Sequence, residues 1–79
     1  MHKFHIRLRS FCQIQDFVRI AMRQPFEVLV GNHHQSINGK DFMGMCSLDY
    51  RHPLQVSVTC SDEEYRSLCH KVSEYLVHC

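Results

Sequence analysis

Apolar and polar residues alternate from position 2 to position 9 of the chain, so that one face is apolar and the other is polar. This period of two is typical of a strand in a sheet that is covered on one side. The alternation returns at 26–30 and at 54–60, which predicts two more strands. A turn at Gly31-Asn32 can bring 33–37 back as a short hairpin partner. The inward positions are Phe4, Ile6 and Leu8, then Phe26, Val28 and Val30, then Leu54, Val56, Val58 and Cys60.

Three other stretches have helical spacing, and each follows a residue suited to cap a helix. Ser10 and a glutamine three residues later have the spacing of a capping box, as do Ser61 and a glutamate three residues later. Pro25 ends the first helix, because the residue before a proline is driven out of the helical region. Asp41 can cap the short middle helix. The apolar stripes are Ile14, Phe17, Val18 and Ala21, then Phe42, Met43, Met45 and Cys46, then Tyr65, Leu68, Cys69, Val72 and Leu76.

The predicted order of elements is therefore β-α-β-β-α-β-α. Four alternating strands need one covered face, and three helices can cover it, which predicts a two-layer α+β domain. A ferredoxin-like β-α-β-β-α-β unit with an added helix would give the same order. The 79 residues form one domain, 1–79, and a chain of this length buries only about 60% of its unfolded surface.

Composition narrows the function. A formal charge of +1 gives no electrostatic reason to expect nucleic acid or an anionic membrane as a partner. No apolar run approaches the roughly 18 residues of a membrane span, and the N-terminus does not read as a signal peptide, so we expect a cytoplasmic protein. The cysteines are odd in number and include no C-x-x-C pair, so we expect reduced, mostly buried thiols. They are Cys12, Cys46, Cys60, Cys69 and Cys79.

The histidines do not have the spacing of a metal site. His2 and His5 are three apart and fall on opposite faces of a strand, while His33 and His34 are adjacent and diverge. There is no glycine-rich phosphate loop, and the acids at 62–64 read as the solvated first turn of a helix. We therefore expect no metal, no cofactor and no enzymatic activity.

The segment Asn38 to Leu48, NGKDFMGMCSL, points to a family. It resembles the segment around the regulatory serine of HPr, the histidine phosphocarrier of bacterial sugar phosphotransferase systems, which typically reads N-A-K-S-I-M-G-I-M-S-L. The resemblance extends from about Lys3 to Val77. It implies an HPr-like open-faced β-sandwich, in which two long helices and one short helix cover one face of an antiparallel four-stranded sheet. The matching residues are Asn38, Lys40, Met43, Gly44, Ser47 and Leu48.

The resemblance also locates the position of the phosphate-accepting histidine. In the family this histidine begins the first helix, within a segment like G-L-H-A-R-P-A-x-x-F-V, and passes phosphate from a phosphorylated enzyme to sugar transporters. Here the segment reads RSFCQIQDFV, so Ser10 replaces the histidine, Cys12 the arginine and Gln13 the proline. A serine phosphoester is too stable to hand its phosphate on readily. We expect Ser10 to be a helix cap and Cys12 to be a thiol near a helix N-terminus, where a lowered pKa is one alternative.

Asp41 stands where the family has its regulatory serine. That serine, once phosphorylated, reduces carrier activity and recruits a transcription factor. Phosphate adds about −1.5 to −2 charges and aspartate adds −1, so Asp41 can weakly imitate the modified state, cap the helix, or do both. Phe42, Met43 and Cys46 match positions whose apolar side chains form a docking patch in the family, although some of them can instead turn inward to the core.

The leading hypothesis is an HPr-like protein-binding or regulatory module that has lost the phosphorylation site. Its partner would be a phosphotransferase-system enzyme or a transcriptional regulator. One alternative is an active phosphocarrier that uses a displaced histidine such as His52, on the loop after the short helix. A purely structural or vestigial domain is another.

Overall fold

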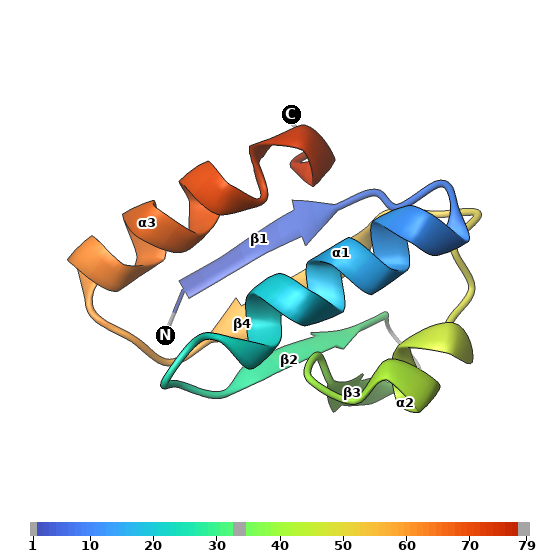
Figure 1. Ribbon diagram of the computed structural model, residues 1–79, viewed down its shortest axis with the longest axis horizontal. Coiled ribbons are helices and arrows are strands. Elements are labelled where there is room, and N and C mark those ends of the chain that lie inside the picture. The colour runs from blue at the N-terminus through green and yellow to red at the C-terminus, as the bar shows by residue number, and fades with distance from the viewer. Residues whose placement is uncertain (1, 33–34, 78–79) are drawn as a thin grey trace.

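Four strands form one sheet, and all the helices lie over the same face of it (Figure 1). The computed structural model describes residues 2–32 and 35–77. Neighbouring strands are antiparallel throughout, in the order β1-β4-β2-β3. The strands are β1 (His2–Ile6), β2 (Val28–Gly31), β3 (Ser36–Asn38) and β4 (Leu54–Val58).

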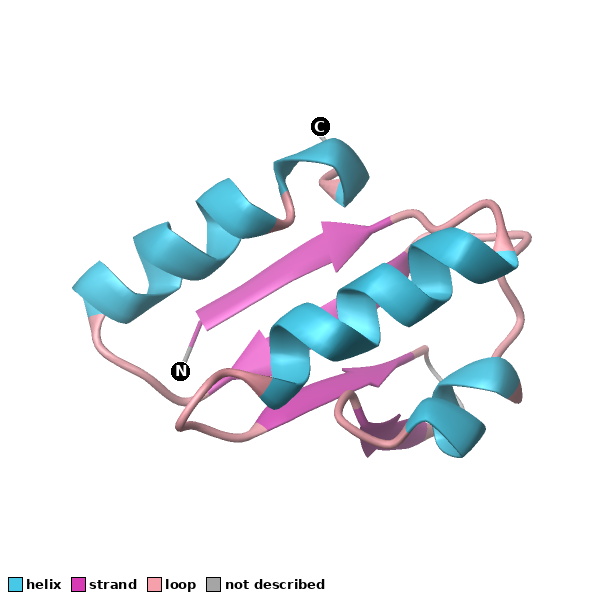
Figure 2. Cartoon of the chain, viewed as in Figure 1, coloured by secondary structure: helices cyan, strands magenta, loops and turns pink. Residues whose placement is uncertain are grey.

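The helices form the second layer, as Figure 2 shows in cyan against the magenta strands. They are α1 (Phe11–Met22), α2 (Phe42–Cys46), α3 (Asp62–Lys71) and a 3-10 turn, η1 (Ser73–Tyr75). The predicted two-layer α+β architecture is confirmed. The ferredoxin-like alternative is wrong, because that unit places its third strand between the first two, whereas here β4 lies between β1 and β2. None of the helices among the described residues is long and apolar enough to cross a membrane.

The strand predictions hold at the centre of each strand and differ at the ends. Val28 and Val30 are fully buried, but Phe26 precedes β2 and is only half-buried against the core. Cys60 likewise follows β4 and is half-buried. The hairpin partner of β2 is Ser36–Asn38, and positions 33 and 34 of the predicted partner lie outside the described residues.

Both long helices begin at the serines that the sequence indicated. Ser10 caps α1 by accepting a hydrogen bond from the Gln13 backbone N–H at 3.3 Å. In a usual capping box the Gln13 side chain would accept a hydrogen bond from the N–H of the cap residue itself. Here it accepts from the N–H of Arg9, one residue before the cap, at 2.6 Å. Ser61 and Glu64 make both hydrogen bonds of a complete capping box at the start of α3.

The last helix is shorter than its apolar stripe predicted. It ends at Lys71, and after η1 the chain becomes extended at Leu76, which forms an antiparallel bridge with Ile6. The Arg7 N–H donates to the Tyr75 carbonyl at 2.8 Å, and the Val77 N–H donates to the His5 carbonyl at 3.0 Å. The prediction of a helix through Leu76 was wrong because these bonds to β1 require extended backbone.

The core lies between the sheet and the helices. It combines the inward side chains of β1, β2 and β4 with one stripe from each helix, including Phe17 of α1, Met45 of α2 and Leu68 of α3. The predicted inward positions Ile6, Val30 and Val56 are completely buried. No helix among the described residues covers the other face of the sheet (Figure 1).

Tyr75 connects η1 to α1 through a side-chain hydrogen bond. Its hydroxyl donates to the Asp16 carboxylate at 2.6 Å, and the residue is 5% exposed. We expect Tyr75→Phe to lower the free energy of unfolding at pH 7 by about 1–3 kcal/mol, since the acceptor is charged. Urea unfolding in Asp16 and Asp16→Asn backgrounds checks this, because the loss must shrink in the second. An equal loss in both backgrounds would show that the hydrogen bond contributes nothing.

The same contact predicts a loss of stability at alkaline pH. Burial, and then the hydrogen bond to Asp16, raises the pKa of Tyr75 to about 12 from its ordinary value of 10.0. Between these values the unfolded chain has released the proton and the folded chain keeps it, so the free energy of unfolding falls as pH rises. Unfolding measured from pH 9 to about 12 is expected to show a shallower fall in Tyr75→Phe.

Candidate functional site

The start of α1 carries Ser10, at the position where the resemblance places an acceptor histidine. Ser10 is exposed, and its hydroxyl is engaged as the acceptor of the Gln13 N–H. Arg7, Arg9 and Gln13 line a shallow hollow of about 370 Å³ beside it, together with Glu74. The predicted cap is therefore confirmed. Arg7 and Arg9, the basic residues nearest to Ser10 in sequence, thus line the same hollow as the acidic Glu74.

Cys12 is an exposed free thiol in the first turn of α1. It stands where the resemblance places an arginine, and it brings no fixed positive charge to the helix start. Its reactivity stays a prediction.

An aromatic pair joins the start of α1 to the start of α2. The rings of Phe11 and Phe42 meet edge to face with centroids 5.4 Å apart and an angle of 82° between planes. Edge-to-face contact is a favoured geometry for two aromatic rings. Phe42 is half-buried against the core, whereas Phe11 is 59% exposed.

The exposed surface around this pair is apolar. Met43 is 77% exposed and Cys46 is also exposed, while Met45 between them is fully buried. Side chains three and four residues apart share one face of a helix, so Phe42 and Cys46 lie together on α2, with Met43 beside them. We call this surface, made of Phe11, Phe42, Met43 and Cys46, the α1–α2 patch.

Phe11 was missed by the sequence reasoning. It lies three residues before Ile14 and seven before Val18, so it belongs to the apolar stripe of α1. It stays exposed because it stands in the first turn, where it meets α2 rather than the sheet. An apolar residue at the first position after a helix cap was the available signal.

The residues that carried the family resemblance hold α2 in place. The Asn38 side chain accepts from the Lys40 N–H at 2.9 Å, and the Lys40 ammonium donates to the Gln24 carbonyl at 2.8 Å, after the end of α1. The Ser47 hydroxyl donates to the Gly44 carbonyl at 2.6 Å. The matching residues therefore specify the position of the short helix.

A tyrosine outside the matching segment secures the same helix. The Tyr50 hydroxyl donates to the Met45 carbonyl, and burial raises the pKa of Tyr50 to about 12. The hydroxyl therefore remains protonated at physiological pH and remains a donor. This bond fixes the end of α2 that carries Cys46.

Asp41 occupies the N-cap position of α2, but its side chain makes no capping hydrogen bond. The prediction that its carboxylate caps the helix is wrong in this respect. The backbone is extended at Asp41, and a carboxylate oxygen lies over Gly44, 3.1 Å from where a Cβ would be. Asp41 is exposed, so its negative charge stands at the surface beside Phe42.

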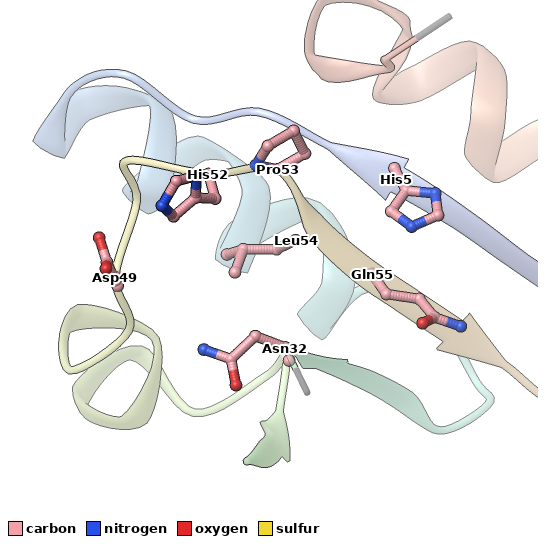
Figure 3. A pocket seen from close by; sticks show the side chains of 8 residues that line it. His5, Asn32, Asp49, His52, Pro53, Leu54 and Gln55 are labelled. Carbon is pink, nitrogen blue, oxygen red and sulfur yellow. The ribbon is translucent and has the colours of Figure 1, made fainter. Parts of the chain in front are cut away.

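His52 lies on the loop between α2 and β4 and is exposed. It lines a hollow with His5 and Asp49, as Figure 3 shows. Among the described residues no hydrogen bond joins His52 to Ser10 or to Arg9. The structure therefore groups His52 with residues of the sheet.

The two histidines of β1 lie on different faces of the sheet. His2 stacks on Tyr65 of α3 with ring centroids 4.3 Å apart and pairs with Asp62 at 3.0 Å, whereas His5 points to the uncovered face. Within residues 2–32 and 35–77, no three His, Cys, Asp or Glu side chains are grouped so as to hold a metal. His33 and His34 lie outside the described residues.

The thiols are less buried than predicted. Cys12 and Cys46 are exposed, and Cys60 and Cys69 are half-buried, all four as free thiols. The expectation of mostly buried cysteines was wrong, because the two on α1 and α2 lie outside the core stripe and the other two lie at its margin. Burial raises the pKa of the Cys60 thiol. Cys79 lies outside the described residues.

Comparison with known proteins places this architecture in a class. No protein-family model matches the chain, and a search of curated proteins finds no match. Among solved structures, HPr-C-His from Thermoanaerobacter tengcongensis aligns with a TM-score of 0.72 at 19% identity, over 94% of this chain and 93% of that chain. The phosphocarrier protein HPr from Bacillus anthracis str. Ames aligns with a TM-score of 0.62 at 20% identity, over 90% and 93%.

The open-faced sandwich is thus the fold of the HPr phosphocarrier proteins. The resemblance inferred from Asn38 to Leu48 is confirmed at the level of the fold. At 19% and 20% identity the likeness shows the fold alone.

Proposed function

We propose that this HPr-like chain is a protein-binding or regulatory module related to the sugar phosphotransferase system, and that it is not a competent phosphocarrier. Its partner is a phosphotransferase-system enzyme or a transcriptional regulator in the cytoplasm. The observation that carries the proposal is the exposed α1–α2 patch next to a helix start whose acceptor position holds Ser10.

The chemistry of Ser10 argues against a phosphoryl relay. A relay needs an acceptor whose phosphate bond keeps a high transfer potential, which a phospho-imidazole provides and a serine phosphoester does not. The Ser10 hydroxyl is already engaged as the cap of α1. Cys12 supplies no fixed charge to stabilise a phosphate dianion.

The α1–α2 patch has the composition of a protein contact. Exposed aromatic and methionine side chains are enriched in interfaces, and methionine adapts its shape to a partner. Met43 is 77% exposed and Phe11 is 59% exposed, and with Phe42 and Cys46 they form one group instead of lying singly over the surface. Asp41 adds a negative charge at the border of the patch.

Phosphate transfer tests the first half of the proposal. The chain is incubated with phosphoenolpyruvate and the phosphotransferase enzyme I, with and without HPr kinase, and its intact mass is measured. We expect no acid-labile phosphate on the wild type and uptake by a Ser10→His, Cys12→Arg variant. Stable uptake on a histidine of the wild type would overturn the proposal. Loss of that uptake in His52→Ala would then establish the displaced-histidine alternative.

Binding tests the second half. We expect Met43→Glu and Phe11→Ala to weaken binding of enzyme I, measured by calorimetry, by at least about tenfold, because each removes an apolar contact from the patch. Met22→Glu is the matched control, since Met22 is 64% exposed on α1 and lies outside the patch. Equal weakening by Met22→Glu, or no binding of enzyme I or of a catabolite regulator, would contradict the docking role.

A further inference from the structure

The uncovered face of the sheet carries a hollow that the proposed function does not use. Because side chains alternate along a strand, the residues between the buried positions of β1, β4 and β2 point to this face. The strand register places His5 opposite Gln55, and Gln55 opposite Gly31. These residues form one row across the sheet, and the row has no side chain at Gly31.

The loop before β4 and the end of β2 complete the hollow. Figure 3 shows His5 and Gln55 on neighbouring strands, Asp49 and His52 on the loop, and Asn32 after β2. The space is about 550 Å³, which is within the range of small-molecule sites. Pro53 gives it an apolar margin, whereas the Leu54 side chain is buried in the core on the other side of the sheet.

Several polar side chains of this hollow have no hydrogen-bonding partner among the residues that the structure describes. His5, His52 and Gln55 make no hydrogen bond or ion pair in the part of the chain that the structure describes. They therefore offer the imidazole nitrogens and both ends of an amide to a ligand. Gln55 is half-buried on a central strand, where its direction is restricted.

Asp49 adds a fixed acceptor. Its carboxylate takes hydrogen bonds from the Arg51 guanidinium at 2.9–3.3 Å and from the Arg51 backbone N–H at 3.0 Å. The Arg51 hydrogen bonds hold the pKa of Asp49 down to about 2, so the group is an oriented carboxylate at neutral pH. Arg51 is not among the residues that line the hollow.

The residues that line the hollow favour one chemical class of ligand. A phosphate or other anion would meet the Asp49 carboxylate and no lysine or arginine. A metal is disfavoured because no three ligating side chains are grouped among the described residues. A purely apolar molecule would leave the Gln55 amide and the imidazoles of His5 and His52 without hydrogen bonds. A neutral molecule with several hydroxyl groups matches the mixture of donors and acceptors.

We propose that the hollow formed by His5, Asn32, Asp49, His52 and Gln55 binds a small, neutral, hydroxyl-rich molecule of the size of one sugar ring. The site lies on the face of the sheet opposite the helices, so it is separate from the α1–α2 patch. The proposed sugar site is therefore independent of the proposal that the chain has lost phosphoryl transfer.

Titration of the ¹⁵N-labelled chain with glucose tests the site. We expect saturable shifts of the amide signals of His5, His52 and Gln55, with millimolar affinity and no shift in α2. Gln55→Leu is expected to weaken binding by at least about tenfold, because it removes a hydrogen-bonding group without shortening the side chain. Gln15→Leu makes the same change on an exposed position of α1 and should bind as the wild type does.

Parallel titrations with inorganic phosphate and with zinc chloride separate the other chemistries. The proposal is overturned if glucose gives no saturable shift, if either ion saturates the same signals at lower concentration, or if Gln15→Leu weakens binding as much as Gln55→Leu. Enzyme I binding by Gln55→Leu should equal that of the wild type, which keeps this result distinct from a failure of the docking proposal.

Discussion

Replacement of Phe17 by alanine is expected to lower the free energy of unfolding by about 3–5 kcal/mol. Phe17 is 1% exposed and is among the largest fully buried side chains of the core. A domain of 79 residues has a total stability of about 4–12 kcal/mol. The variant should therefore lose a large part of its stability, or not fold at all at 37 °C. Urea unfolding followed by circular dichroism measures the loss.

Phe11→Ala is the matched control on the same helix. Phe11 is 59% exposed, so its removal should cost less than about 1 kcal/mol of stability while it weakens partner binding. The two substitutions thus separate the core stripe of α1 from the α1–α2 patch. If Phe17→Ala lost less than about 1 kcal/mol, the packing described for α1 would be incorrect.

The second large effect is expected at Gly31. A Cβ at this position would lie 2.2 Å from the Gln35 carbonyl oxygen and 2.8 Å from the Ser36 Cα. Both are backbone atoms of the hairpin between β2 and β3, so they cannot turn aside as a side chain would. We expect Gly31→Ala to cost about 2–3 kcal/mol, through displacement of β3. Unfolding in urea and the amide spectrum of 35–38 test this.

Glycine is needed at position 31 because there is no room for a Cβ. Its φ angle is negative, as are those of the other glycines, so no conformational preference explains it. Gly44→Ala is the control, because its Cβ would meet the ends of the Asp41 and Ile37 side chains at 3.1 and 3.3 Å. Those ends can move, and alanine favours helix, so the change should stay within about 1 kcal/mol. A similar loss for both variants would refute the hairpin contact.

The sequence predicted the ends of helices correctly where residues close in sequence determine them. Ser61 with Glu64, and Pro25 after α1, act over a few residues, and the structure has the helix ends that they indicate. The end of α3 could not be predicted in this way. It depends on hydrogen bonds between 75–77 and β1, which are distant in sequence.

The candidate site was predictable in position and less so in contacts. Counting from Asn38–Leu48 placed Ser10 at the start of α1, as observed. The pairing of Phe11 with Phe42 joins two elements separated by the β2–β3 hairpin, so spacing alone could not reveal it. Asp41 was expected to cap by its residue type, but its carboxylate lies over Gly44 instead. The sequence pattern could not predict the directions in which the side chains of Phe11 and Asp41 point.

The bonds that the segment after η1 makes to β1 have a consequence for how copies of the chain meet. An edge strand with open N–H and C=O groups is a template for another strand. Here the outer edge of β1 at His5 and Arg7 is already occupied by Tyr75 and Val77. The opposite edge, β3, spans only Ser36–Asn38. Both edges of the sheet therefore disfavour the addition of a strand from another molecule. Copies of the chain are then expected to associate through side-chain surfaces.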